Sequence, residues 1–116
     1  MVEYQNHSLA LNYDDVFQAL SDSTRRDILS RVLAGEQRIT DLAKEYSMSF
    51  AGVAKHLDVL VRAQLVNKVK KGREQVVSAN PDAVRQTTEL LQQYEKIWTA
   101  RFHNLDKFLS NEIEGI

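Results

Sequence analysis

The chain has 116 residues and a formal net charge of −1 from 15 basic and 16 acidic side chains, a size and balance typical of one globular domain and not of a disordered chain. With 43% hydrophobic residues it can bury a core, while no apolar run approaches the ~20 residues that a membrane span requires. The N-terminus has no signal-peptide pattern and the chain has no cysteine, so we expect a cytoplasmic protein without membrane contact, disulfides, thiolate metal ligands or a cysteine nucleophile.

Two short helices are expected after an irregular N-terminal arm over residues 1–12. The first begins at Asp14 and stops at Ser21-Asp22, and the second starts there with Asp22 or Ser23 as its cap. In both segments apolar side chains recur at helical spacing on one face, so each helix is expected to pack that face on a core.

A helix-turn-helix unit is expected next. Thr40 is a suitable cap for a third helix and Ser49 for a fourth, and only Ser47 and Met48 lie between the two helices. Two amphipathic helices joined by so short a turn, the second opening into a basic stretch, form the unit that many DNA-binding proteins use. Most helix pairs do not read DNA, so the pattern alone leaves the function open.

A β-hairpin is expected to follow the fourth helix. The turn is Lys70-Lys71-Gly72-Arg73, and it is flanked by the β-forming residues Leu65, Val66, Val69, Val76 and Val77. A hairpin with a basic tip directly after a helix-turn-helix unit is a wing, and its cations can lie along or inside a DNA minor groove.

One long helix is expected at the C-terminal end, from about Asp82 to Glu112, because Pro81 suits a first helical turn and no Gly or Pro recurs before Gly115. At ~1.5 Å per residue it would be roughly 46 Å long, more than the width of a small domain. Its apolar side chains recur at helical spacing and make a stripe wider than one short partner can cover. A second copy of the chain is the economical partner, and a helix lying wholly on its own core is the alternative.

The charges are unevenly distributed along the chain. Residues 49–74 carry six basic and two acidic side chains, a net charge of +4, while the segments before and after are acidic. Such a basic segment on a nearly neutral protein can attract phosphate. It can also be a solvated surface that binds nothing, and charge alone does not separate the two interpretations.

These residues, taken in order, resemble a known family. LSDSTRRDIL (20–29), DLA (41–43), VAKHLDVL (53–60), Leu65-Val66 and Gly72-Arg73 are similar to the ArsR-like winged helix-turn-helix regulators of bacteria. The resemblance implies a mainly α fold with a small β-hairpin and a long C-terminal dimerisation helix. It also implies one domain over residues 1–116, with a DNA-binding core over 14–80 and the dimerisation helix over 82–112.

The family further implies a homodimeric transcriptional regulator, most simply a repressor, on a partly palindromic operator, with double-stranded DNA and a second copy as its partners. Dimer contacts come from the first and last helices in this family. The residues expected to make them here are Val16, Leu91, Tyr94, Trp98, Phe102, Leu105 and Leu109.

Several positions depart from the family pattern. Arsenic and cadmium sensors of the family carry cysteines where this chain has Arg38 and Thr40, and the only echo of a second metal site is His103 with Asp106. Two ligands hold a metal weakly, so no metal or other cofactor is expected. Gln64 stands where the family has a glycine closing the recognition helix, and a positive φ there would cost ~1–2 kcal/mol.

The DNA-binding residues are expected on the fourth helix and on the wing. The set comprises Ser49, Phe50, Ala51, Gly52, Lys55, His56, Arg62, Lys68, Lys70, Lys71 and Arg73. Lys55 is the best single donor to a guanine or a phosphate, and Arg73 is the favoured cation for a minor groove. Phe50 can contact thymine methyl groups or pack in the core, and His56 can contact a phosphate or be an ordinary surface residue.

Two other function classes fit the sequence less well than DNA binding does. An enzyme is disfavoured because no nucleophile elbow, phosphate-binding glycine loop or zinc-type pair is present. A winged-helix module that binds protein is the alternative, and the basic wing favours nucleic acid over it. Arg25 and Arg26 are expected to pair with Asp22 and Asp27 in a structural role. The operator and any small-molecule effector remain unknown from the sequence.

Overall fold

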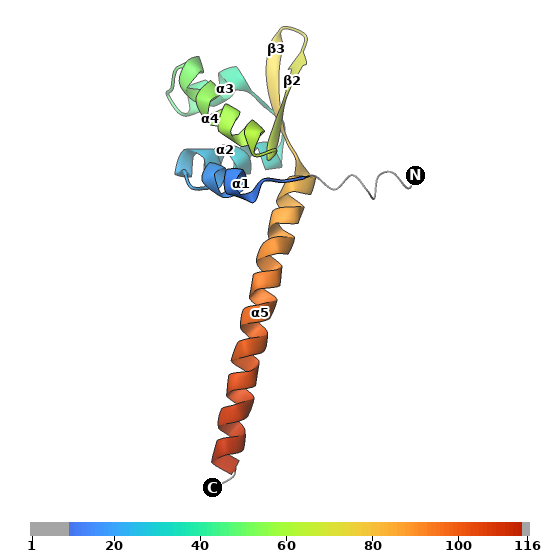
Figure 1. Ribbon diagram of the computed structural model, residues 1–116. Helices are drawn as coiled ribbons and strands as arrows, with labels where there is room; N and C mark the ends of the chain where they lie inside the picture. Colours follow the sequence, from blue (N-terminus) through green and yellow to red (C-terminus); the bar gives the residue numbers. More distant parts are fainter. Residues whose placement is uncertain (1–9, 115–116) are drawn as a thin grey trace, which may run out of the picture. The chain divides into compact units, whose positions relative to one another are not determined.

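The computed structural model describes residues 10–114, which form two compact units, one ending at Val84 and one beginning at Arg85. The first nine residues of the predicted N-terminal arm lie outside the described residues. The elements in chain order are α1 (Tyr13–Leu20), α2 (Ser23–Ala34), β1 (Gln37–Arg38), α3 (Ile39–Glu45), α4 (Phe50–Arg62), β2 (Val66–Lys71), β3 (Glu74–Ala79) and α5 (Pro81–Glu114) (Figure 1).

Side-chain caps define where α2 and α4 begin. Asp22 accepts a hydrogen bond from the backbone N–H of Arg25 at 3.0 Å, and Ser49 accepts one from Gly52 at 3.0 Å. Both caps satisfy backbone donors that the first helical turn leaves free. Of the two caps predicted for α2, Asp22 and not Ser23 is the one observed, and the prediction of Ser49 is confirmed.

The start of α3 differs from the prediction. Its N-cap is Arg38, which makes no side-chain cap hydrogen bond, and Thr40 lies inside the first turn of the helix. Arg38 is also the last residue of β1, so the chain passes directly from a strand into a helix. The prediction of Thr40 as a cap was wrong because this short strand, which has no sequence signal of its own, fixes the preceding backbone.

The arginines that open α2 satisfy the end of α1. Arg25 and Arg26 donate side-chain hydrogen bonds of 2.7–3.0 Å to the carbonyl oxygens of residues 18–20. These are the carbonyls that a helix C-terminus leaves without partners, and a guanidinium is well placed there. Their structural role agrees with the prediction, but their side chains bond carbonyl oxygens and not the carboxylates of Asp22 and Asp27.

The three strands form one antiparallel sheet in the order β1-β3-β2. The hairpin of β2 and β3 pairs Lys71 with Glu74, so its loop is only Gly72-Arg73, and Gly72 has the positive φ of 64° that glycine adopts most easily. The predicted hairpin is confirmed with a tighter turn. β1 was not predicted, because two residues are too few to show alternation.

The core lies within the unit that ends at Val84, and helices α1 to α4, the sheet and the first turn of α5 contribute to it. Each large apolar side chain removed from water contributes about 1.5–3 kcal/mol to folding. The most completely buried members are Val16, Ile28, Ile39, Leu42, Val53, Leu57, Leu60, Leu65, Val66 and Val77.

Val16 belongs to this core, with none of its surface exposed. It therefore has no atom to offer a second copy, and its prediction as a dimer contact was wrong. The reason is a difference of one position along a helix: Val16 points inward while Phe17, the next residue, is 41% exposed.

Gln64 has the predicted positive φ, at 63°. Its carbonyl oxygen accepts a hydrogen bond of 2.9 Å from the side-chain amide of Asn80, and the backbone N–H of Asn80 donates to Leu65 at 2.9 Å. Asn80 thus joins the end of the hairpin to the turn after α4. These bonds hold the chain in a conformation that costs a residue other than glycine ~1–2 kcal/mol.

The second unit is the outer part of α5, and the predicted long helix is confirmed. Eight large apolar side chains here are 50–68% exposed, and at ~100° per residue they fall on one arc of about 140° of the helix surface. We call this set the apolar stripe: Leu91, Tyr94, Ile97, Trp98, Phe102, Leu105, Phe108 and Leu109. Over residues 10–114, no helix combines the length and the apolar character needed to cross a membrane.

Candidate nucleic-acid interface

Helix α4 buries one face and exposes another. Val53, Leu57 and Leu60 have no exposed surface, while Lys55 and Arg62 are exposed on the opposite side. This is the division that the sequence predicts for a recognition helix, whose apolar face packs on the core and whose other face is free to enter a groove.

The N-terminal end of α4 presents small side chains and one aromatic ring to solvent. Ser49 and Ala51 are exposed, and Phe50 is 53% exposed, so Phe50 is a surface residue and not part of the core. The Phe50 ring lines a shallow hollow of about 180 Å³ together with Thr40 of α3 and Arg73 of the wing. Helix and wing therefore border one continuous surface.

Gly52 has a local structural reason to lack a side chain. A Cβ atom at this position would lie 3.3 Å from Oγ of Ser49, the oxygen that caps the helix, and 3.7 Å from Met48. The first of these distances is tighter than an ordinary contact, so a larger residue would displace the capping hydroxyl. The glycine keeps the N-terminal end of α4 narrow, as close approach to DNA also requires.

His56 faces another helix. Its Nδ1 atom lies 3.8 Å from Oδ2 of Asp22, the N-cap of α2. The N–H of Arg25 holds the pKa of Asp22 below its ordinary value, and the nearby Arg25 and His56 lower it further. Asp22 therefore stays ionised beside His56, which makes His56 a contact between α4 and α2 and leaves less of its ring for a phosphate.

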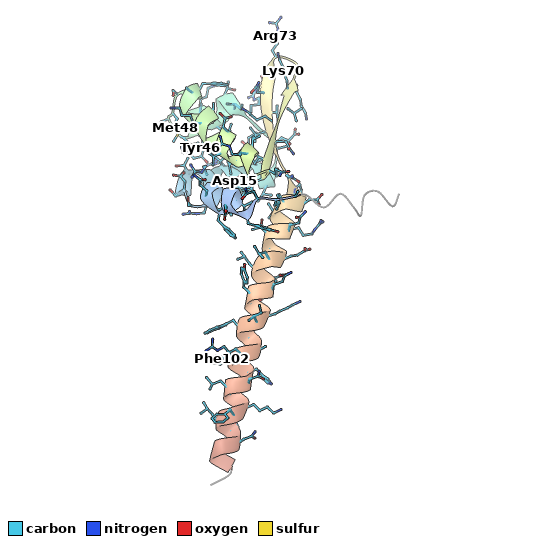
Figure 2. The ribbon with its side chains drawn as sticks, viewed as in Figure 1. Asp15, Tyr46, Met48, Lys70, Arg73 and Phe102 are labelled. Atoms are coloured by element: carbon cyan, nitrogen blue, oxygen red, sulfur yellow. The ribbon has the colours of Figure 1, made fainter. Side chains whose placement is uncertain are left out.

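Of the four cations of the wing, two form ion pairs with carboxylates and two do not. Lys68 is bonded to Asp58 of α4 at 3.1 Å, and Lys71 is bonded to Glu36 at 2.8 Å. Lys70 and Arg73 form no ion pair among the described residues, and Figure 2 shows Arg73 at the tip of the hairpin. Free cations bind phosphate without first giving up a carboxylate.

A third ion pair neutralises the acidic residue beside Arg73. Arg38 donates to Glu74 at 3.1 Å and to Asp41 at 2.8 Å. The bond from Arg38 holds the pKa of Asp41 below its ordinary value, and Asp41 in turn raises the pKa of Arg38. Arg38, which occupies a position where the resemblance places a metal-binding cysteine, thus connects α3 to the turn end of the wing.

Among residues 10–111, no group of three or more histidine, aspartate or glutamate side chains is placed to hold a metal ion. His103 and Asp106, the only echo of a metal site in the sequence, lie exposed on α5.

The sequence did not reveal the acidic partners of the wing. Glu36 lies 35 positions before Lys71, and Asp58 lies ten positions before Lys68. Neither spacing is a helical or hairpin spacing, so only the folded chain brings these charges together. A charge count over residues 49–74 includes Asp58 but cannot show that it faces Lys68.

Comparisons with known proteins agree with this geometry. Residues 22–68 match the family model described as bacterial regulatory protein, arsR family. The transcriptional repressor SdpR of Bacillus subtilis (strain 168) is 33% identical over 60 residues, which cover 52% of this chain and 67% of SdpR.

Two solved structures have a similar fold. An ArsR-like transcriptional regulator from Rhodococcus sp. RHA1 is 33% identical, with a TM-score of 0.72 over 82% of this chain and 90% of that one. A homodimeric winged helix-turn-helix DNA-binding domain from Mycobacterium bovis superposes with a TM-score of 0.60 over 72% of this chain and 79% of that one, at 21% identity.

Proposed function

The chain belongs to the ArsR family of bacterial regulatory proteins and is a DNA-binding transcriptional regulator; we propose that it acts as a homodimer that represses transcription from a partly palindromic operator. One observation carries the proposal: the solvent-facing side of α4 and the free cations of the wing border one surface, with Phe50 and Arg73 lining the same hollow. A DNA duplex fits such a surface with a helix in the major groove and a wing on the backbone.

Helix α4 is the proposed reader of base edges. Lys55 is the exposed cation near its N-terminal end, and Ser49, Phe50, Ala51 and Gly52 supply a small hydroxyl, apolar surface and room for close approach. None of these residues has the two-pronged donor geometry of arginine on guanine or asparagine on adenine. Direct readout is therefore limited, and DNA shape supplies part of the specificity.

The wing is the proposed source of most of the affinity. Lys70 and Arg73 are free among the described residues, so each can displace counterions from the DNA backbone. Lys68 and Lys71 must leave Asp58 and Glu36 to do the same, and their contribution is correspondingly smaller. Arg62, exposed at the C-terminal end of α4, adds a further phosphate contact.

A second copy of the chain is the proposed cover for the apolar stripe. Eight large apolar side chains that are 50–68% exposed make a patch that soluble monomers rarely present to water. The Mycobacterium bovis domain with the same fold is homodimeric, which supports the same assembly here. Leu91, Tyr94, Trp98, Phe102, Leu105 and Leu109 make the contact in this proposal. Two recognition helices then read half-sites about 34 Å apart.

Selection from a random double-stranded DNA library tests the proposal. The purified full chain is expected to enrich fragments with two related half-sites whose centres lie about one DNA turn apart. Sedimentation of the chain alone and with an enriched fragment is expected to give two copies per duplex. A chain that retains no DNA in dilute buffer would overturn the proposal and favour the protein-binding alternative.

A further inference from the structure

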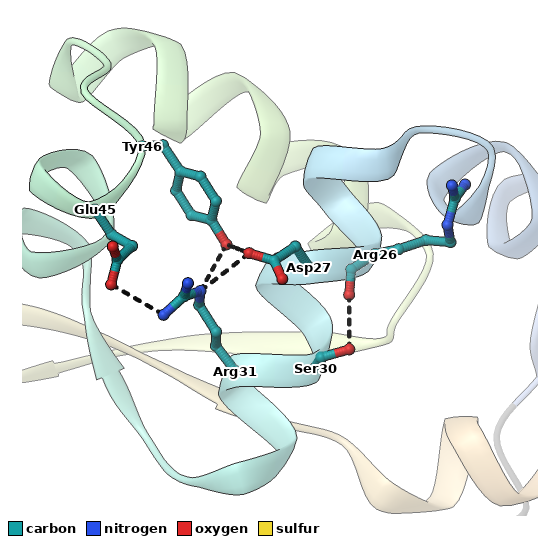
Figure 3. Close-up of polar contacts among 6 residues, drawn as sticks. All are labelled: Arg26, Asp27, Ser30, Arg31, Glu45 and Tyr46. Carbon is teal, nitrogen blue, oxygen red and sulfur yellow. Dashed lines mark hydrogen bonds and ion pairs between the residues drawn. The ribbon is translucent and has the colours of Figure 1, made fainter.

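A cluster of four polar side chains joins α2 to the C-terminal end of α3. The Tyr46 hydroxyl donates to a carboxylate oxygen of Asp27, and Nε of Arg31 lies 3.0 Å from both the Tyr46 hydroxyl and the same Asp27 oxygen. Arg31 also donates from Nη1 to Glu45 at 3.0 Å. Figure 3 shows these side chains, the Tyr46 cluster, pointing toward one another from the two helices.

The cluster ends beside the turn between α3 and α4. Ser47, the residue after Tyr46, has a φ of 52°, in the left-handed region that residues with a Cβ rarely adopt. Met48 then donates its backbone N–H to Ala43 at 3.0 Å, and Ser49 caps α4. A conformation of this kind persists only where its surroundings hold it in place.

Burial alone does not explain the choice of tyrosine at this position. A phenylalanine would present the same ring to the core, and the Arg31 guanidinium, 5.5 Å from the ring centre, could still lie over it. What tyrosine adds is a hydroxyl that forms hydrogen bonds with two side chains of α2, Asp27 and Arg31. This hydroxyl favours the ionised form of Asp27: the hydrogen bond from Tyr46, and then the one from Arg31, hold the pKa of Asp27 below its ordinary value.

We propose that Tyr46 is a positioning residue for DNA recognition: its bonds to Asp27 and Arg31 hold the left-handed turn at Ser47 and thereby set the direction in which α4 leaves α3. The inference rests on the proposed function, because it concerns how α4 is aimed at base edges. Contacts to bases require a fixed geometry, whereas the wing and its phosphates tolerate small displacements. The cluster therefore acts on sequence discrimination more than on affinity for DNA in general.

The test substitutes Tyr46→Phe and compares two DNA probes. One is a fragment enriched by the wild-type chain from a random library, and the other is a scrambled fragment of the same length. We expect the ratio of the two affinities to fall roughly tenfold, with the slope of log affinity against log salt unchanged, because no phosphate contact is lost. Tyr13→Phe is the matched control, since the Tyr13 hydroxyl makes no hydrogen bond within the described residues.

A second substitution separates positioning from stability. Ser47→Gly removes the cost of the left-handed turn, so the turn no longer depends on the cluster. Tyr46→Phe with Ser47→Gly is expected to recover most of the lost discrimination. A Tyr46→Phe variant with a lower melting temperature but an unchanged affinity ratio, or one that Ser47→Gly does not rescue, would overturn the inference.

Amide hydrogen exchange of the Tyr46→Phe variant tests the inference without any DNA. In Tyr46→Phe the amides of Met48 and Gly52, which bond Ala43 and Ser49, are expected to exchange faster, while those of the hairpin keep their wild-type rates. If the wild-type chain enriched no DNA, the proposed function would fail while this measurement still decided whether the cluster holds the turn. Unchanged exchange at Met48 and Gly52 would contradict the inference.

Discussion

The two compact units of the chain differ in how far their large apolar side chains are exposed to solvent. In the winged unit Leu57, Leu60 and Val77 have no exposed surface, because helices and sheet from the same chain cover them. In the outer part of α5 the apolar stripe is 50–68% exposed, because a single helix has nothing of its own to cover it. The first unit obtains its stability from its own fold, whereas in the proposed homodimer the second depends on a partner and hence on protein concentration.

The same substitution in the two units gives the largest expected contrast. Leu57→Ala leaves a cavity in the core and is expected to lower the free energy of unfolding by about 2–5 kcal/mol. Leu105→Ala, at a residue that is 54% exposed, removes no core contact and is expected to change the unfolding of a dilute sample much less. Chemical denaturation at low protein concentration measures both, and equal losses would erase the distinction between the units.

Trp98→Ala tests the dependence of the second unit on a partner. Trp98 is 64% exposed and lies within the apolar stripe, so its loss is expected to weaken dimerisation by about 2 kcal/mol or more. Sedimentation equilibrium over a range of concentrations gives the dissociation constant. Lys96→Ala, on the charged face of the same helix, is the control that is expected to leave it unchanged, and a Trp98 variant as tightly dimeric as wild type would point to a different interface.

In the proposed complex the cations of the wing contact the DNA backbone and those of α5 do not. Lys70→Ala with Arg73→Ala is expected to flatten the slope of log affinity against log salt by about 1.8, the amount for two lost phosphate contacts. Lys96→Ala with Lys107→Ala makes the same charge change on α5 and is expected to leave the slope unaltered. Titrations of fluorescent DNA at several salt concentrations provide the measurement, and equal effects of the two pairs would remove the wing from the mechanism.

Gln64→Gly is expected to stabilise the winged unit. Relief of the left-handed backbone at φ 63° offsets the added freedom of glycine in the unfolded chain, for a net gain of about 0.5–1 kcal/mol. Gln18→Gly places the same substitution inside helix α1, where it is expected to cost about 1 kcal/mol. The side-chain amide of Gln64 also donates a hydrogen bond of 3.3 Å to the carbonyl oxygen of Ala10. Thermal melting distinguishes the two signs, and a loss of stability at Gln64 would mean that this bond outweighs the strain.

The smallest expected signal is spectroscopic. Burial, followed by the hydrogen bond to Asp27, raises the pKa of Tyr46 to about 12. Protonated Tyr46 therefore contributes to the stability of the folded chain fully below the ordinary tyrosine pKa of ~10, and this contribution is lost as the pH rises through about 12. Ultraviolet titration is expected to show a tyrosine ionisation near pH 12, and Tyr46→Phe is expected to remove that step. A late step that survives the substitution would assign the shift to another tyrosine.

Local chemistry explains which parts of the fold could be predicted. The caps at Asp22 and Ser49, the positive φ at Gln64 and the single long helix after Pro81 each depend on a few neighbouring residues, and each is found in the structure. Thr40 was misassigned because β1, a strand of two residues, exists only through its pairing with β3. A strand with no alternation of its own leaves no trace in the sequence.

The candidate site, too, could be predicted from the sequence only in part. The sequence identified α4 and the wing as the elements that carry the charge, because both lie in one basic segment over residues 49–74. It could not separate the free cations Lys70 and Arg73 from the paired Lys68 and Lys71, whose partners come from α4 and from the residue before β1. Long-range contacts of this kind follow from the packing of the whole unit.

By itself the sequence determined the order and type of the main elements, the family, and the apolar periodicity of α5, since all of these are written in spacings of a few residues. Only the tertiary structure decided that Val16 lies in the core, that His56 faces Asp22, and that Tyr46 is bonded across to α2. The physical reason is that burial and polar partnership depend on which surfaces meet when the helices pack, and a periodic pattern fixes the face of a helix but not its neighbour.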